Sequence, residues 1–561
     1  MKELQFDASK PHPLNLTFPS MDLKELEDMK TILRRLSNGK AIAWDGVTDS
    51  IFKKDWQEKN ATIFSDLWKN LGLIKNKHFE SRLIPLNKVH PQIPSRKDMR
   101  PIVVTSPIVK LIEAGLLPEL SEYLIKNLHH GQTGFVPGFG IFVNIHRAIE
   151  RIKLRTLDKR RCYGVFVDFS SAYNTIDHQI LFQRLQPILG EEKTQLIRAL
   201  YSRMKIRLGN EVLLPKQGVT QGSLISPALF DIYEESLLQT IENETKISEE
   251  DILAYADDIM VICDSVDQVR RVIQVIREWS GQNNMKLNKK KSGVVEFIGR
   301  RMRTSIRIDK ISGFPVCKEY KYLGLKLNCK LSMNSHLDYI SNKSKDIHRR
   351  LSPFLYQADL DTRKNLWQVF IQPLLEFALP LYKWETAISN VKRANSVFRS
   401  TFKLFTGLSR RSENTLVDLL SGYDFNLRAS LNYKIYSEKW ICRKNGTVLN
   451  YEDIPISFRK ALHPDKRNLC KFMPKEFIHY LNLTKSSCPT CETPSTFDHL
   501  ECRHHLKLPN ANELLRLCQK VQDGKAPRKE SLELMREIIN PYLRRLRHFL
   551  ARENNSTSWI K

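Results

Sequence analysis

Two adjacent carboxylates, Asp257 and Asp258, interrupt an apolar run that extends from Ile252 to Ile262. The Ile- and Val-rich residues on either side predict two buried strands, and the polar break predicts a tight hairpin with the acids at its tip. Like charges in a poorly hydrated place repel each other and lose solvation, so a cation normally compensates them. An isolated Asp-Asp tip is more often a solvated turn. A metal site therefore requires a further acid nearby.

Asp168 is that further acid, because it ends an apolar strand predicted over 162–168. If the two strands are neighbours, three carboxylates converge at their ends and can hold two divalent cations about 3.5–4 Å apart. One cation then activates an attacking hydroxyl and the other stabilises a leaving oxygen, which is the chemistry of in-line phosphoryl transfer. A glycine-punctuated loop over 217–227 runs into a helix and would let backbone approach a ligand closely.

Alternating helical and strand patterns predict the elements that position these acids. We expect a helix over 21–36, strands within 83–105, the strand 162–168, helices over 176–189, 226–243 and 265–284, and strands near 294–298, 306–309 and 320–327. This order is typical of an α+β fold. The pattern is helical over 335–410, and we expect its aromatic residues, Phe354, Tyr356, Trp367, Phe370, Phe377, Tyr382 and Trp384, to form a core.

The overall charge favours a polyanionic partner. The 561 residues include 89 Lys and Arg against 62 Asp and Glu, a net charge of +27, which suits nucleic acid. No apolar run is long enough for a membrane helix, and we predict no membrane partner. The N-terminus lacks a signal-peptide pattern, and the ten scattered cysteines suit a reducing intracellular compartment.

Several blocks in this order resemble the reverse transcriptases of non-LTR (LINE-like) retrotransposons. They are Asn-Gly-Lys at 38–40, Trp-Asp-Gly at 44–46, Arg-Pro-Ile at 100–102, Asp-Phe-Ser-Ser-Ala-Tyr at 168–173, Gln-Gly-Val-Thr-Gln-Gly-Ser at 217–223, Tyr-Ala-Asp-Asp at 255–258, Met-Lys-Leu-Asn-Lys-Lys-Lys-Ser at 285–292 and Tyr-Leu-Gly-Leu at 322–325. The likeness extends over about residues 25–430.

The resemblance implies a right-hand polymerase with fingers, palm and thumb. Its expected boundaries are an N-terminal segment and fingers over 1–160, a palm over 161–330 with the catalytic acids in 161–260, a helical thumb over 331–430, and a basic helical C-terminal region over 431–561.

The resemblance also implies roles for individual residues. Asp168 and Asp257 would bind two Mg²⁺ ions, and Asp258 would complete the catalytic acids. The residues expected to bind the nucleotide are Lys88, Arg100, Tyr173, Gln221, Gly222 and Lys291. Within that set, Tyr173 would exclude a ribose 2′-hydroxyl, Arg100 and Lys88 would neutralise the triphosphate, and Lys291 would protonate pyrophosphate, although Lys289 and Lys290 lie close in sequence.

A cysteine cluster near 488–505 has ligand spacing suited to structural zinc. Cys488, Cys491, His499 and Cys502 form a C-x2-C-x7-H-x2-C pattern, and His504 is an alternative fourth ligand. The cluster resembles the C-terminal CCHC knuckle of the same family. The alternative is a pair of reduced loop cysteines.

The predicted function is an RNA-directed DNA polymerase that extends a primer 3′-hydroxyl with dNTPs on an RNA template, by two-metal-ion catalysis. Its partners would be an RNA template, a DNA primer and dNTPs, and assembly into a ribonucleoprotein with its own RNA is a further option. A nuclear location is favoured over a cytoplasmic one. We expect no endonuclease domain, because too few residues lie outside the blocks. The alternative is a non-enzymatic RNA-binding protein that keeps the polymerase fold as a scaffold.

Overall fold

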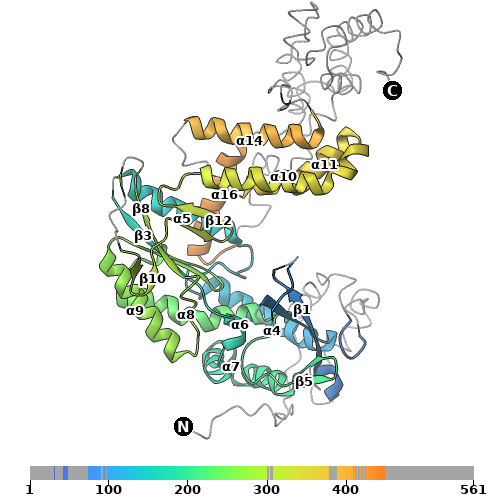
Figure 1. Ribbon diagram of the computed structural model, residues 1–561. Coiled ribbons are helices and arrows are strands. Elements are labelled where there is room, and N and C mark those ends of the chain that lie inside the picture. The colour runs from blue at the N-terminus through green and yellow to red at the C-terminus, as the bar shows by residue number, and fades with distance from the viewer. Residues whose placement is uncertain are drawn as a thin grey trace, which may run out of the picture. The chain divides into compact units, whose positions relative to one another are not determined.

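The computed structural model describes residues 42–47, 74–89, 92–95, 98–158, 160–299, 302–303, 308–377, 388–408 and 425–448, with a few single positions elsewhere. The chain separates into two compact units (Figure 1). Unit 1 is Met1–Leu323 with Glu438–Leu449, and unit 2 is Gly324–Ser437 with Asn450–Lys561. A segment from beyond the predicted thumb therefore belongs to unit 1.

A four-stranded sheet in the order β6-β7-β3-β8 lies at the centre of unit 1. Its strands are β6 (Ile252–Tyr255), β7 (Asp258–Cys263), β3 (Cys162–Val167) and β8 (Gly293–Phe297). Every residue of β3 and β8 is buried, as expected of strands covered on both faces. The predicted strand at 162–168 and the predicted hairpin are confirmed, and β3 and β7 are direct neighbours.

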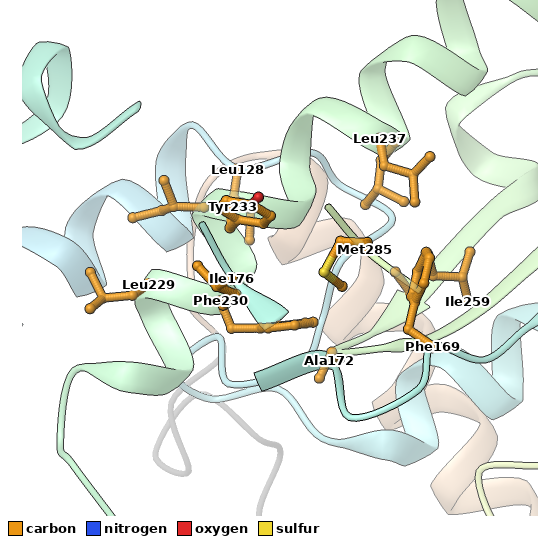
Figure 2. Close-up of a cluster of buried hydrophobic side chains, with 14 of the residues drawn as sticks. Leu128, Phe169, Ala172, Ile176, Leu229, Phe230, Tyr233, Leu237, Ile259 and Met285 are labelled. Atoms are coloured by element: carbon orange, nitrogen blue, oxygen red, sulfur yellow. The ribbon is translucent and has the colours of Figure 1, made fainter. Parts of the chain in front are cut away.

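Helices bury this sheet. The helix α8 (Ser226–Thr245) starts with a proline in its first turn and packs against α9 (Val266–Gln282), which contacts β3 and β7. The helix α5 (Ile141–Leu157) contacts β3 and β6. Figure 2 shows the core between them, where Phe169, Ile259 and Met285 gather beside Phe230 from α8. Phe169 and Ile259 directly follow Asp168 and Asp258 in the chain, so these acids adjoin the apolar core.

Three of the longer helices described in unit 1 differ from the sequence expectation, and one of them, α5, was not predicted. The predicted helix 176–189 is α7 (His178–Arg203), which continues past a non-helical break at Gly190. The helix α4 (Pro107–Lys126) was not predicted, because apolar residues surround much of it and blur the helical period. Its N-terminus is capped by the Ser106 hydroxyl, which accepts from the Ile108 amide.

A second sheet of unit 1, in the order β2-β1-β4-β5, contains the predicted strands of 83–105. Its strands are β1 (Glu80–Asn87), β2 (Met99–Val104), β4 (Lys205–Leu208) and β5 (Glu211–Leu213). The remaining short strands near the end of the unit are β9 (Lys310–Ile311), β10 (Phe314–Pro315) and β11 (Glu319–Tyr322). Short 3-10 turns, η3 (Asn76–Phe79) and η5 (Glu249–Asp251), precede β1 and β6. The mixed α and β composition that was predicted is confirmed.

Unit 2 begins with β12 (Leu325–Asn328) and is otherwise helical where the structure describes it. Its helices are α10 (Asn334–Gln357), α11 (Leu360–Phe370), α12 (Gln372–Glu376) and α14 (Ile388–Thr406), and α16 (Phe425–Lys444) runs on into the segment that belongs to unit 1. No helix among the described residues combines the length and apolar character needed to cross a membrane.

The aromatic residues of unit 2 do not form one core, contrary to the expectation. Trp367 is fully buried and makes edge-to-face contacts with Phe398 and Phe402. Phe354 and Tyr356, however, are 70% and 89% exposed near the end of α10. Helical spacing alone does not separate a buried aromatic face from an exposed one. Tyr382 and Trp384 lie outside the described residues.

Candidate active site

The strand register brings the three acids to one end of the central sheet. Val167 pairs with Ile259 in the antiparallel β3–β7 ladder, so the next residues outward, Asp168 and Asp258, leave the ladder at the same end. Asp257 occupies the turn between β6 and β7, where Tyr255 pairs with Asp258. The sequence prediction that two strands would carry these acids to one place is therefore consistent with the register.

The charged forms of the hairpin acids are disfavoured in their surroundings, and a nearby cation would stabilise them. Burial raises the pKa of Asp257, and the charge of Asp168 adds to this, whereas Lys291 and Arg100 act in the opposite direction. Loss of hydration, followed by the charges of Asp257 and Asp168, raises the pKa of Asp258 to about 6. Asp258 nevertheless lies on the exposed side of the turn. The charge of Asp168 therefore acts on both Asp257 and Asp258.

Asp168 is oriented by the segment that follows α9. The Asn288 side-chain amide donates to the Asp168 carboxylate at 2.9 Å, and the Asn288 backbone amide donates to the Asp168 carbonyl at 2.8 Å. The Ser292 hydroxyl accepts from the Asp168 amide at 3.1 Å. The Lys291 ammonium lies 3.8 Å from the carboxylate and is itself mostly exposed. Among the three neighbouring lysines, Lys291 is thus the one paired with a candidate metal ligand.

The acids fit a divalent cation by their chemistry, although they are not arranged as a complete ligand set. Among the described residues, no group of three or more His, Cys, Asp or Glu side chains is placed to hold a metal ion. Carboxylate oxygens are the ligands that Mg²⁺ prefers. A cation between Asp168 and Asp257 would offset both the burial and the charge repulsion that raise the pKa of the hairpin acids.

The glycine loop at 217–223 ties two other predicted residues to the site. The Val219 amide donates to the Tyr173 carbonyl at 2.7 Å, and the Val103 amide of β2 donates to the Gln221 carbonyl at 2.7 Å. Gly222 has φ +135°, and a Cβ there would lie 2.1 Å from the Val103 carbonyl oxygen. Only glycine allows this approach. The loop therefore joins the Tyr173 segment to the strand that carries Arg100.

Tyr173 presents a fixed ring beside the acids. Its ring stacks on Phe230 with centroids 4.9 Å apart and an interplanar angle of 11°. Burial raises the pKa of the Tyr173 hydroxyl, and Asp231 and Asp257 reinforce the shift. The phenol is therefore neutral at physiological pH.

The two cations predicted from the finger region are placed differently. Arg100 is exposed on β2, opposite Leu86, and contributes to the potential at Asp257. Lys88 is also exposed and lies one residue past β1, where its backbone amide donates to the Asp98 carbonyl at 2.8 Å. The structure thus supports Arg100 as part of the acidic site's surroundings and gives Lys88 no recorded interaction with the acids.

Sequence patterns did not identify Gln132 and Asn144, whose side chains hydrogen-bond the backbone of the β6–β7 hairpin. The Gln132 side-chain oxygen accepts from the amides of Gly134 and Ala256, both at 2.9 Å. Its amide donates to Glu234 at 2.8 Å. The Asn144 side chain donates to the Ala254 carbonyl at 2.6 Å. The only signal in the sequence was a polar, glycine-punctuated stretch at 129–134, which by itself predicts a loop.

The segment that contains the three acids matches a known protein family. Residues 86–327 match the family described as reverse transcriptase (RNA-dependent DNA polymerase). This segment of the chain is similar to a reverse transcriptase domain. Its matched residues include Arg100, Asp168, Tyr173, Gln221, Gly222, Asp257, Asp258 and Lys291.

Relatives of the domain come from mobile elements. The chain is 23% identical over 393 residues to the RNA-directed DNA polymerase from mobile element jockey of Drosophila funebris, covering 66% of this chain and 42% of the relative. It is 23% identical over 427 residues to the probable RNA-directed DNA polymerase from transposon X-element of Drosophila melanogaster, covering 72% and 46%. The chain thus spans less than half the length of these relatives.

Among solved structures, apo telomerase from Candida tropicalis is similar at 12% identity with a TM-score of 0.36, covering 75% of this chain and 85% of that chain. A similarity of this size does not identify the fold. The predicted zinc residues Cys488, Cys491, His499, Cys502 and His504 lie outside the described residues.

Proposed function

We propose that this chain is an RNA-directed DNA polymerase that extends a primer 3′-hydroxyl with dNTPs on an RNA template. The observation that carries the proposal is the placement of Asp168 and Asp258 at one end of the β3–β7 ladder, with Asp257 in the adjoining turn. The site lies inside the segment that matches the reverse transcriptase family.

Each part of the site has a function that its chemistry suits. Asp168 and Asp257 would hold Mg²⁺, with Asp258 beside them, and bound Mg²⁺ supplies activation of the primer hydroxyl and stabilisation of the leaving oxygen. Arg100 and Lys291 provide positive charge toward the triphosphate and the departing pyrophosphate. The ring of Tyr173, fixed on Phe230, restricts the space beside the sugar. Gln221 and Gly222 offer backbone to the nucleotide.

Primer extension with an isosteric variant tests the proposal. Purified wild-type protein should extend a DNA primer on an RNA template with dNTPs and Mg²⁺, and Asp257→Asn should abolish extension because it removes a ligand charge without changing side-chain volume. Asp267→Asn is the matched control, since Asp267 lies at the surface in α9 with its side chain 88% exposed. Equal extension by wild type and the Asp257 variant would refute the assignment.

The same assay separates the polymerase from an RNA-binding scaffold and from an RNA-dependent RNA polymerase. A scaffold protein would bind one structured RNA stoichiometrically and would synthesise no DNA with any divalent cation. An RNA polymerase would use NTPs in preference to dNTPs. Tyr173 favours a DNA product, and Tyr173→Ala should increase NTP use relative to dNTP use.

Two further parts of the proposal concern residues and properties beyond the described site. We propose a structural zinc ion at Cys488, Cys491 and His499, with Cys502 or His504 as the fourth ligand, on the basis of their spacing. Metal analysis of wild type, Cys502→Ser and His504→Ala would identify the fourth ligand by loss of zinc. We also propose a nuclear location, which fluorescence microscopy of the tagged chain would test.

A further inference from the structure

The segment Glu438–Leu449 belongs to the same compact unit as the acids, although more than a hundred residues of unit 2 precede it. Its residues Trp440 and Arg443 are buried, with Arg443 fully so. Trp440 lies under the Arg147 guanidinium, 4.5 Å from it, and the Lys439 ammonium donates to the Gly138 carbonyl at 2.9 Å. We call residues 438–448 the return segment.

The Arg443 guanidinium donates hydrogen bonds to several backbone carbonyls at and just after the end of α4. It donates to the carbonyls of Ile125 and Leu128, the latter at 2.9 Å, and reaches those of His129 and Gln132 at 3.4 and 3.5 Å. The last carbonyls of a helix have no partner within it, and a cation there is favourable. Burial lowers the pKa of Arg443 to about 10, so it stays charged at neutral pH.

The loop held by Arg443 is the loop that holds the acidic hairpin. The backbone at 131–133 pairs with Ala254, through a bond from the Ala254 amide to the Gly131 carbonyl at 2.9 Å and one from the Thr133 amide to the Ala254 carbonyl at 3.0 Å. Gln132 then fixes the Ala256 amide. Ala256 has φ +50°, a left-handed conformation that a non-glycine residue keeps only when its surroundings enforce it.

We propose that Arg443 is a positioning residue for the catalytic acids: it clamps the Gln132 loop, Gln132 fixes the Ala256 backbone, and that backbone sets the orientation of the next residue, Asp257. The proposal rests on the polymerase function proposed above. The recorded hydrogen bonds of Arg443 are to backbone carbonyls and none is to Asp168, Asp257 or Asp258, so the proposed effect passes through the loop.

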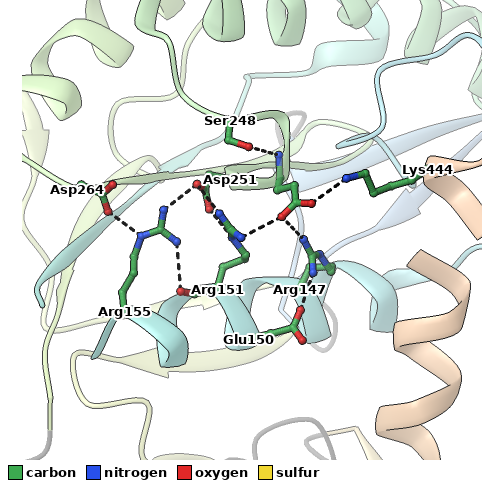
Figure 3. Close-up of polar contacts among 9 residues, drawn as sticks. Arg147, Glu150, Arg151, Arg155, Ser248, Asp251, Asp264 and Lys444 are labelled. Atoms are coloured by element: carbon green, nitrogen blue, oxygen red, sulfur yellow. Dashed lines mark hydrogen bonds and ion pairs between the residues drawn. The ribbon is translucent and has the colours of Figure 1, made fainter. Parts of the chain in front are cut away.

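The return segment also offers a matched control. Lys444, the next residue, pairs with Glu250 at 2.8 Å in a network that joins it to Arg147, Arg151 and Asp251 (Figure 3). Both members of the Lys444–Glu250 pair are partly exposed, so the pair contributes little. Lys444→Met therefore perturbs the same segment without loosening the Gln132 loop.

Mg²⁺ titration of the full chain, followed by thermal unfolding without substrate, tests the proposal. Arg443→Met should raise the Mg²⁺ concentration at half of the thermal shift by about tenfold, as is typical for groups that orient metal ligands from outside the coordination sphere. Arg443→Lys, which keeps the charge without the fork, should lie between. Lys444→Met should match wild type. Arg443→Met equal to Lys444→Met would overturn the proposal, and if Arg443→Met is insoluble, Arg443→Lys decides in the same way.

A second variant separates positioning from a change of charge. Arg443 also offsets the fully buried Asp231 carboxylate. If the double variant Arg443→Met/Asp231→Asn recovers wild-type Mg²⁺ dependence, the effect was electrostatic and the positioning role is wrong. If the weakened dependence persists, the carbonyl clamp is responsible. If the wild-type chain binds Mg²⁺ but synthesises no DNA, the proposed polymerase function is refuted. The role of Arg443 in Mg²⁺ binding is then still tested by the Mg²⁺ titration.

Discussion

The side-chain amide of Asn288 donates to the Asp168 carboxylate at 2.9 Å, across 120 residues of sequence. This bond leaves the other carboxylate oxygen of Asp168 available and fixes the plane of the group. We predict that Asn288→Ala raises the Mg²⁺ concentration needed for half-maximal primer extension by roughly tenfold or more, because an unsupported carboxylate samples many orientations. Asn243→Ala, an exposed position at the end of α8, is the control and should leave the Mg²⁺ dependence unchanged.

Glu113 gives the protein a pH-dependent stability. It is buried on α4 and accepts from the Leu224 amide at 2.8 Å, and burial raises the pKa of its carboxyl from 4.5 to about 7. Because the folded-state pKa is above the unfolded one, this contribution to stability is complete below about pH 4.5 and is lost as the pH rises through about 7.

We therefore predict that Glu113→Gln flattens the change in unfolding free energy between pH 4.5 and 7, by up to about 3 kcal/mol. Urea titrations at several pH values, analysed for both proteins, provide the measurement. An unchanged pH slope in the Gln variant would show that Glu113 is not the group that titrates.

Gly222 and Gly281 should respond in opposite ways to alanine. At Gly222, an added Cβ meets the Val103 carbonyl oxygen and φ is +135°, so Gly222→Ala should separate the loop from β2, destabilise the protein by at least about 1–3 kcal/mol and abolish primer extension. At Gly281, within α9, nothing lies within 4 Å of the added atom. Gly281→Ala should raise stability by about 0.5–1 kcal/mol with normal activity.

Trp367 and Tyr356 provide a similar contrast in unit 2. Truncation of the fully buried Trp367 opens a cavity against Phe398 and Phe402, so Trp367→Ala should cost about 3–5 kcal/mol. Tyr356 is 89% exposed, and Tyr356→Ala should change stability by less than about 0.5 kcal/mol. Thermal unfolding of both variants tests this difference, and a large loss for Tyr356 would mean that the ring is covered.

Sequence patterns predicted those site residues whose type is unusual for their position in the chain. Asp257, Asp258 and Asp168 stand out because charges at the ends of apolar strands are costly, and the glycines of 217–223 stand out because they punctuate polar sequence. The patterns of β3, β7, α8 and α9 were also read correctly, whereas α4 and α5 were not predicted. The right-hand arrangement and the domain boundaries remain predictions.

The supporting residues carry no such signal. Gln132 and Asn144 are ordinary amides whose role depends on backbone groups more than a hundred residues away. Arg443 is one of 89 Lys and Arg residues, and nothing in its neighbourhood predicts burial against α4. The exposed Phe354 and Tyr356 show the same limit, because spacing identifies a helix face but not what covers it.

The return segment also sets an order of events during synthesis. The central sheet β6-β7-β3-β8 is complete by residue 297, yet Arg443 is made only after nearly 150 further residues. Until then the carbonyls of Leu128 and His129 lack their cationic partner, and the Gln132 loop has one anchor fewer. A nascent chain therefore contains Asp168, Asp257 and Asp258 before it contains Arg443, so the proposed ordering of these acids waits for translation of the helical unit.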